Sequence, residues 1–105
     1  MEYISIDELH DKLQNLGPND LIIDVRTPEE FQAGHIHEAQ NTPHEEVLSV
    51  ADRLKQYRTV YIHCKMGGRA KMAAQALQEY GVNNVVCVGD GGIERWTKMG
   101  WALEK

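Results

Sequence analysis

The segment HCKMGGRAKM, residues 63–72, places a single cysteine, Cys64, directly before a short loop that contains two glycines. A helical pattern begins at Arg69, five positions after the cysteine. A cysteine in this place can be a buried structural thiol, a metal ligand, a redox-active thiol or a nucleophile. The residues around Cys64 have to decide between these chemistries.

The loop after Cys64 has the composition of an anion-binding site. Its glycines let the backbone curl so that several amides face one point, and the free amides at a helix start carry the positive end of the helix dipole. Nearby cations and a helix start lower the pKa of a cysteine thiol, and they also attract an anionic substrate. We therefore predict that Cys64 is a nucleophilic thiolate. The residues predicted to form its pocket are Lys65, Met66, Gly67, Gly68 and Arg69.

The remaining cysteine and histidines do not favour a metal site or a disulfide. Only two cysteines occur, and a reducing cytosol disfavours a disulfide between Cys64 and Cys87. Cys87 lies within the apolar run VVCV, with no cation next to it, so we predict a core thiol. His35 and His37 could hold a metal, but no cluster of cysteines or carboxylates supports them. The sequence therefore predicts no metal.

Two charged residues and one histidine lie near the same predicted strand ends as Cys64. Asp24 and Arg26 could touch substrate, although the sequence favours a structural ion pair or loop tie for them. His63 directly precedes Cys64, and the alternation of side chains along a strand points the two in opposite directions. We therefore do not predict that His63 is a general base.

These residues are positioned by short strands that alternate with helices. The runs 21–25, 60–64 and 85–88 are almost continuously apolar, as in parallel strands buried on both faces, and an edge strand is expected near residues 3–4. Such alternation predicts an α/β fold with a mainly parallel sheet and helices on both of its faces. Ligands of such sheets bind beyond the carboxyl ends of the strands, where Cys64 lies.

Helix starts are predicted by three capping boxes. Ser5, Thr27 and Thr42 are each followed three residues later by a glutamate, a pattern in which the two side chains satisfy free backbone amides. Two further helices are expected after Arg69, ending at Gly81, and over residues 92–99. The predicted order is β-α-β-α-α-β-α-β-α.

Length and charge limit the classes of function. The chain has 105 residues, of which 42% are hydrophobic, which suits a single domain over residues 1–105. Its net charge is −5 and no basic face is apparent, so nucleic acid is not an expected partner. No apolar stretch is long enough to cross a membrane, and no signal sequence is recognisable, so we expect a cytoplasmic protein.

Three segments, taken together, resemble the signatures of a single-domain rhodanese, a sulfurtransferase. They are DVRTPEEFQAGHIHEAQNTP (24–43), CKMGGR (64–69) and GGIERWTKMG (91–100). The resemblance implies a three-layer α/β/α fold whose mainly parallel sheet has about five strands. Lys65 departs from the family pattern, in which arginine is frequent, and so does Gly89, where a larger apolar residue is usual.

The resemblance also implies a two-step reaction through Cys64. The thiolate would take the outer sulfur of a small anionic donor such as thiosulfate, become a persulfide, and pass that sulfur to an acceptor. The acceptor would be cyanide in an assay, and a thiol or a carrier protein in the cell. Residues 65–69 would bind the donor, and no cofactor would be required. This is covalent catalysis with ping-pong kinetics.

Three alternatives remain open at the level of sequence. A phosphatase or arsenate reductase of the same fold would have five residues between the cysteine and the arginine, whereas Cys64 and Arg69 are separated by four. A non-catalytic module that only binds a partner would often lack the cysteine. A persulfide carrier would use Cys64 without acting on small donors.

Overall fold

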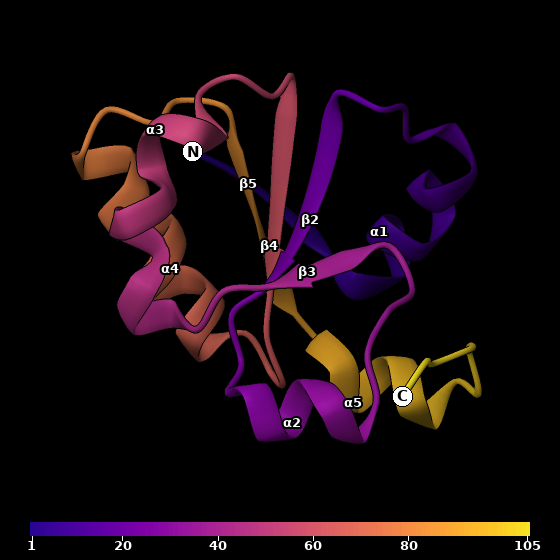
Figure 1. Cartoon of the computed structure of the whole chain (residues 1–105). Coiled ribbons are helices and arrows are strands. Elements are labelled where there is room, and N and C mark those ends of the chain that lie inside the picture. Colours follow the sequence, from indigo (N-terminus) through magenta and orange to yellow (C-terminus); the bar gives the residue numbers. More distant parts are fainter.

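The computed structural model describes residues 1–105 and has a five-stranded sheet at its centre (Figure 1). The spatial order of the strands is β1-β5-β4-β2-β3, and every neighbouring pair is parallel. The strands are β1 (Glu2–Ser5), β2 (Asp20–Asp24), β3 (Ala39–Asn41), β4 (Thr59–His63) and β5 (Val85–Asp90). The predicted α/β fold with a parallel sheet is therefore confirmed.

Five α-helices and two 3₁₀ segments alternate with the strands, and the last helix follows the last strand. The helices are α1 (Ile6–Lys12), α2 (Pro28–Ala33), α3 (Ala51–Leu54), α4 (Gly68–Glu79) and α5 (Gly92–Lys98). The 3₁₀ segments are Leu13–Asn15, which extends α1, and His44–Val50, which leads into α3. No helix combines the length and the apolar character that crossing a membrane requires.

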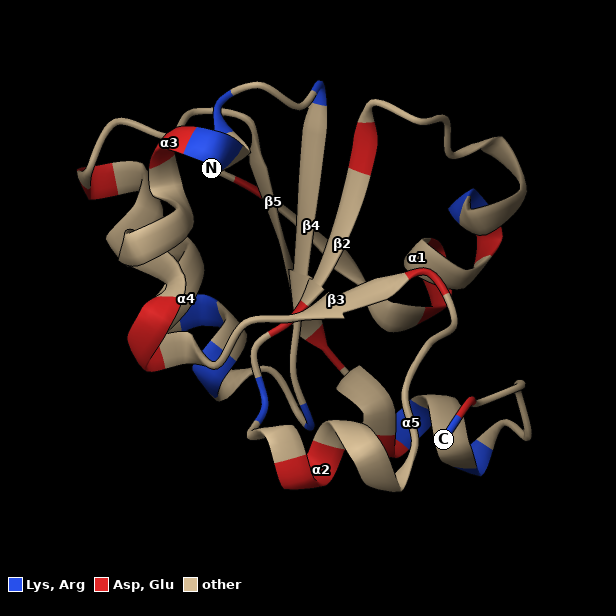
Figure 2. Ribbon diagram, in the orientation of Figure 1, with Lys and Arg blue, Asp and Glu red and all other residues tan.

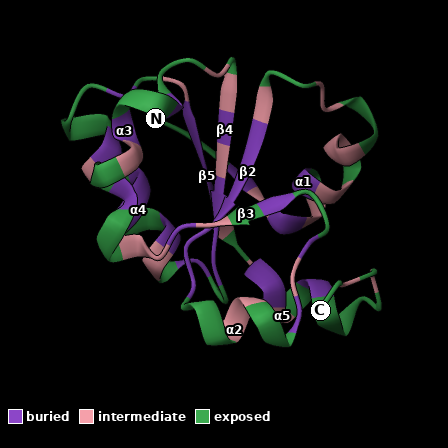
Figure 3. Cartoon of the chain, in the orientation of Figure 1, coloured by how far each residue is buried: buried purple, intermediate pink, exposed green.

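Both faces of the sheet are covered, which explains the continuous apolar runs of the central strands. One buried cluster joins Ile23, Ile62 and Cys87 to residues of α3 and α4, and the other joins Ile22 and Val88 to residues of α1 and α5. Figure 3 shows the result as a buried sheet with exposed outer helix surfaces. The remaining helix, α2, lies at the carboxyl edge of the sheet (Figure 1).

Two of the three predicted capping boxes form, and the third prediction was wrong. The side chains of Ser5 and Thr27 accept from the amides of Glu8 and Glu30, which reach back to the cap residues. Thr42 does not cap a helix. Its amide donates instead to the Asp24 carbonyl at 3.0 Å, so the backbone continues along β2 and the following turns are 3₁₀ without a side-chain cap.

The sequence pattern did not predict the strand β3. Ala39–Asn41 is three residues long and mostly polar, and it pairs with Ile22–Asp24 at the edge of the sheet. A segment this short shows no periodicity, so only its pairing with β2 makes it a strand.

Candidate active site

Cys64 follows the last residue of β4 and lies beneath the loop that leads into α4. The thiol is almost completely buried, with 1% of the residue exposed. Its Sγ accepts hydrogen bonds from the amides of Gly67 at 3.0 Å and Ala70 at 3.3 Å. These two donors at the start of a twelve-residue helix can stabilise a negative charge on the sulfur.

The curl of the loop depends on Gly67. This residue has a φ of 126°, and a Cβ built on it would lie 2.4 Å from the Gly89 carbonyl oxygen. The loop therefore packs directly against the end of β5, and the glycine at position 67 is required on both steric and conformational grounds. A Cβ on Gly68 would meet nothing within 4 Å, so the two glycines are not equivalent.

The start of α5 holds the same loop from another side. The amides of Ile93 and Glu94 donate to the carbonyl oxygens of Cys64 and Lys65, at 2.9 and 3.0 Å. Gly92, with a φ of 46°, permits this close approach, because a Cβ there would lie 2.5 Å from the Cys64 oxygen. The sequence showed Gly92 only as part of a motif and not as a support of the cysteine loop.

The two loop cations have different surroundings. Lys65 is exposed and is not ion-paired with a carboxylate. Arg69 forms two parallel hydrogen bonds with Glu30 of α2, at 2.6 and 3.0 Å. The Arg69 guanidinium lowers the pKa of Glu30 to about 2. The sequence identified Glu30 only as a capping residue, and it did not show that Arg69 is paired. Met66, next to Lys65 in the loop, has 63% of its surface accessible.

Similarity to known proteins agrees with this geometry. The family model of the rhodanese-like domain matches residues 5–99. The chain belongs to the rhodanese-like domain family. Its structure is similar to that of a rhodanese-like domain protein from Staphylococcus aureus, with 33% identity, a TM-score of 0.79 and 91% of each chain covered. It is also similar to a thiosulfate sulfurtransferase from Pseudomonas aeruginosa, with 27% identity, a TM-score of 0.81, and 99% of this chain and 20% of the other covered.

One curated relative of this rhodanese-like domain is YrkF of Bacillus subtilis, a candidate sulfur carrier protein. The two are 36% identical over 76 residues, which make up 72% of this chain and 40% of YrkF. The chain spans 40% to 59% of the relatives it matches in Bacillus subtilis and Arabidopsis thaliana. The family is therefore related to sulfur transfer and sulfur carriage.

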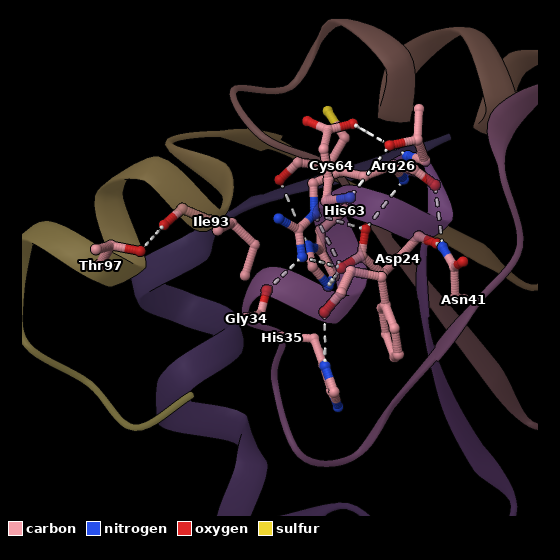
Figure 4. Close-up of polar contacts among 12 residues, drawn as sticks. Asp24, Arg26, Gly34, His35, Asn41, His63, Cys64, Ile93 and Thr97 are labelled. Atoms are coloured by element: carbon pink, nitrogen blue, oxygen red, sulfur yellow. Dashed lines mark hydrogen bonds and ion pairs between the residues drawn. The ribbon is translucent and has the colours of Figure 1, made fainter. Parts of the chain in front are cut away.

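Asp24 and Arg26 form a buried ion pair in the rhodanese-like domain, as the sequence favoured. The Arg26 guanidinium donates to the Asp24 carboxylate at 2.7 to 3.0 Å and to the Gly34 carbonyl at 2.7 Å (Figure 4). The Asn41 side chain donates to the carbonyls of Asp24 and Arg26. This network ties the end of β2 to α2 and β3, so its role in the structure is to support the site.

The two histidines near this network contact backbone carbonyls, that of Phe31 for His35 and that of Cys64 for His63. His63 is completely buried, and its Nε2, which has no hydrogen-bond partner, lies 4.0 Å from the Asp24 carboxylate. Burial lowers the pKa of His63, so the ring is neutral. His35 stacks on Phe31 and bonds the Phe31 carbonyl through Nδ1 (Figure 4). Neither imidazole is hydrogen-bonded to the Cys64 sulfur, whose partners are the amides of Gly67 and Ala70.

Cys87 is the core thiol that its surroundings predicted. It has no exposed surface, and burial raises the pKa of its thiol. A thiol that is protonated and enclosed in the core is a poor nucleophile.

A cavity of about 470 Å³ lies beside the cysteine loop. It is bordered by α2, by α5 and by the side of the loop that carries Lys65. The other residues that line it are Arg26, Glu30, Ala33, Ile93, Glu94, Thr97 and Lys98. The cavity has the size of a small-molecule pocket.

Proposed function

We propose that this rhodanese-like domain transfers a sulfane sulfur through a persulfide on Cys64. The observation that carries the proposal is the pair of amides, from Gly67 and Ala70, that donate to the Cys64 sulfur. The same donors can stabilise a thiolate and, after reaction, the sulfur next to a terminal persulfide anion. The similarity to a thiosulfate sulfurtransferase and to a candidate sulfur carrier supports the same chemistry.

In the first half-reaction, the Cys64 thiolate attacks the outer sulfur of thiosulfate or of another persulfide-type donor. A new S–S bond forms to Cys64 and the S–S bond of the donor breaks. The leaving group takes that electron pair: it is sulfite when the donor is thiosulfate, and a thiolate when the donor is a persulfide. Lys65 is an exposed cation on the loop, and in this proposal it attracts the anionic donor and stabilises the leaving anion.

In the second half-reaction, an acceptor takes the outer sulfur from the persulfide. Cyanide becomes thiocyanate, or a thiolate becomes a persulfide, and Cys64 returns to the thiolate. The reaction as written involves no metal or organic cofactor. A cytoplasmic location suits it, because a reducing compartment keeps the attacking thiol reduced.

A carrier function uses the same persulfide with a different donor. The name of YrkF favours this second candidate, in which Cys64 receives sulfur from another protein and passes it on. A rate of persulfide formation that depends on a protein donor, with little reaction toward free thiosulfate, would identify the domain as a carrier rather than an enzyme acting on small donors.

The proposed function is tested by the mass of the intact protein. Incubation with thiosulfate or an alkyl persulfide should add one sulfur atom, cyanide should remove it, and Cys64→Ser should abolish the addition. Cys87→Ser is the matched control and should retain the addition, because burial raises the pKa of the Cys87 thiol, whereas the Cys64 sulfur accepts two loop amides. A sulfur adduct that persists in Cys64→Ser would assign the chemistry to another residue.

A further inference from the structure

We propose that Glu30 sets the charge selectivity of the Cys64 site by holding Arg69, so that monoanionic persulfides are better donors than dianions such as thiosulfate. This inference rests on the proposed function of Cys64. It concerns the substrate class of that site and assigns Glu30 as a positioning residue.

The contacts of Glu30 show that the ion pair is anchored and not incidental. Its carboxylate accepts from the amide and the hydroxyl of Thr27, at 3.1 and 3.2 Å, in addition to both nitrogens of Arg69. The capping box of α2 thus fixes the carboxylate in place, and the carboxylate fixes the guanidinium. Both side chains are about two-thirds buried: 28% of the Arg69 side chain and 32% of the Glu30 side chain are exposed.

The charge around the loop follows from this pairing. Two cations beside the loop are already neutralised, because Arg69 is paired with Glu30 and Arg26 with Asp24. Lys65 on the loop and Lys71 in the first turn of α4 have no carboxylate partner. Figure 2 shows the acidic residues of α2 next to the basic residues that lead into α2 and α4.

The consequence for substrates depends on their charge. Coulomb energy scales with the charge of the bound ion, so a carboxylate beside the pocket repels a dianion about twice as strongly as a monoanion. Two nitrogens of the Arg69 guanidinium already donate to the Glu30 carboxylate. The same two nitrogens therefore cannot bind an oxyanion of the substrate. In a persulfide monoanion, most of the charge lies on the reacting sulfur. Lys65 and the loop amides can therefore bind such a donor without Arg69.

Glu30→Gln tests this role with the smallest change of shape. Glutamine removes the negative charge but keeps an oxygen that can accept from Thr27, so α2 should remain capped. The matched control is Asp20→Asn. Asp20 also pairs with an arginine, Arg58, but it lies at the first residue of β2, at the opposite end of the strand from Asp24 and the cysteine loop.

The first readout does not depend on turnover. The rate at which iodoacetamide alkylates Cys64 is measured with increasing sulfate at constant ionic strength, with Cys87→Ser as the background. We expect sulfate to protect Glu30→Gln at about tenfold lower concentration than the wild type. Asp20→Asn should behave as the wild type. Equal protection in all three proteins, or an equal shift in both variants, would overturn the proposal.

The second readout compares two donors. In Glu30→Gln the KM for thiosulfate should fall about tenfold, while the KM for a small alkyl persulfide should change less than threefold. Equal changes for the two donors would refute charge selectivity. If the wild type accepts sulfur from no donor, the proposed function fails, and the sulfate protection still decides the role of Glu30.

The double variant Glu30→Gln/Arg69→Gln keeps the proposal testable if the single variant does not fold. Two amides then replace the ion pair, so the net charge beside the pocket is that of the wild type. The readout is selectivity and not basal activity: we expect the ratio of the thiosulfate KM to the alkyl persulfide KM to be that of the wild type, whatever loss the two donors share. A ratio that changes about tenfold would contradict the proposal.

Discussion

At the scale of single residues, the structure separates two adjacent glycines that look alike in the sequence. Gly67 holds a backbone conformation that other residues rarely adopt, and its Cα faces the Gly89 carbonyl at a distance that leaves no room for a Cβ. Gly68, the first residue of α4, faces open space. The cysteine loop therefore needs one of these glycines for its shape and not the other.

Substituting each glycine by alanine should reveal the difference. Gly67→Ala must either shift the loop or accept the clash, and we expect a loss of about 2–4 kcal/mol in the free energy of unfolding. Gly68→Ala is the matched control and should change stability by less than about 1 kcal/mol, because alanine is a better helix residue than glycine. Urea denaturation measures both, and equal losses would contradict this reading of the loop.

At the scale of elements, the Glu30–Arg69 pair joins α2 to α4 across 39 positions of sequence. The main cause of the low pKa of Glu30, about 2 against an ordinary 4.5, is its hydrogen bonding to Arg69. A carboxyl group whose pKa is lower in the folded state stabilises the fold when it is ionised. That stabilisation is complete above the unfolded pKa of 4.5 and is lost as the pH falls from there toward about 2.

The tie between α2 and α4 should therefore make the wild type more acid-sensitive than Glu30→Gln. Between about pH 5 and about pH 3, we expect the stability advantage of the wild type over this variant to shrink by about 1 kcal/mol, a value reduced for solvent screening. Glu29→Gln is the matched control, since Glu29 is exposed on the same helix and is not ion-paired. Parallel pH profiles for the wild type and Glu30→Gln would show that the pair contributes no stability.

At the scale of the whole molecule, the site is assembled at one edge of a sheet that is packed on both faces. The strand that ends directly before Cys64, β4, lies between β5 and β2, and α2 and α5 cross the edge where it ends (Figure 1). The loop can remain fixed around the sulfur because β4 is held on all sides. Stability of the core and geometry of the site are thus linked through one strand.

Removing a buried side chain from β4 should consequently destabilise the whole protein. Ile62→Ala removes a side chain with no exposed surface, and we expect a loss of about 2–5 kcal/mol in the free energy of unfolding. Leu48→Ala, at a position that is 48% exposed, should cost less than about 1 kcal/mol. Thermal or urea unfolding checks both values, and a small effect of Ile62→Ala would show that the core relaxes around the cavity.

The sequence by itself determined those features of the structure that depend on residues close together in the chain. The apolar runs predicted four strands, two of the three capping boxes formed, and the buried cysteine at position 87 was recognised from its surroundings. The loop of residues 64–69 and its place at the carboxyl edge of the sheet could also be predicted, because a strand, a glycine-containing turn and a helix are contiguous in the chain.

Only the tertiary structure decided the interactions that join distant segments. The partner of Arg69, the support of the loop by Gly92 and the pairing that makes β3 a strand all involve contacts across many residues of sequence. No local pattern encodes them, because each depends on which side chains and backbones meet once the sheet has formed. The same reason explains Thr42, whose amide donates to the Asp24 carbonyl at the end of β2 in place of starting a helix.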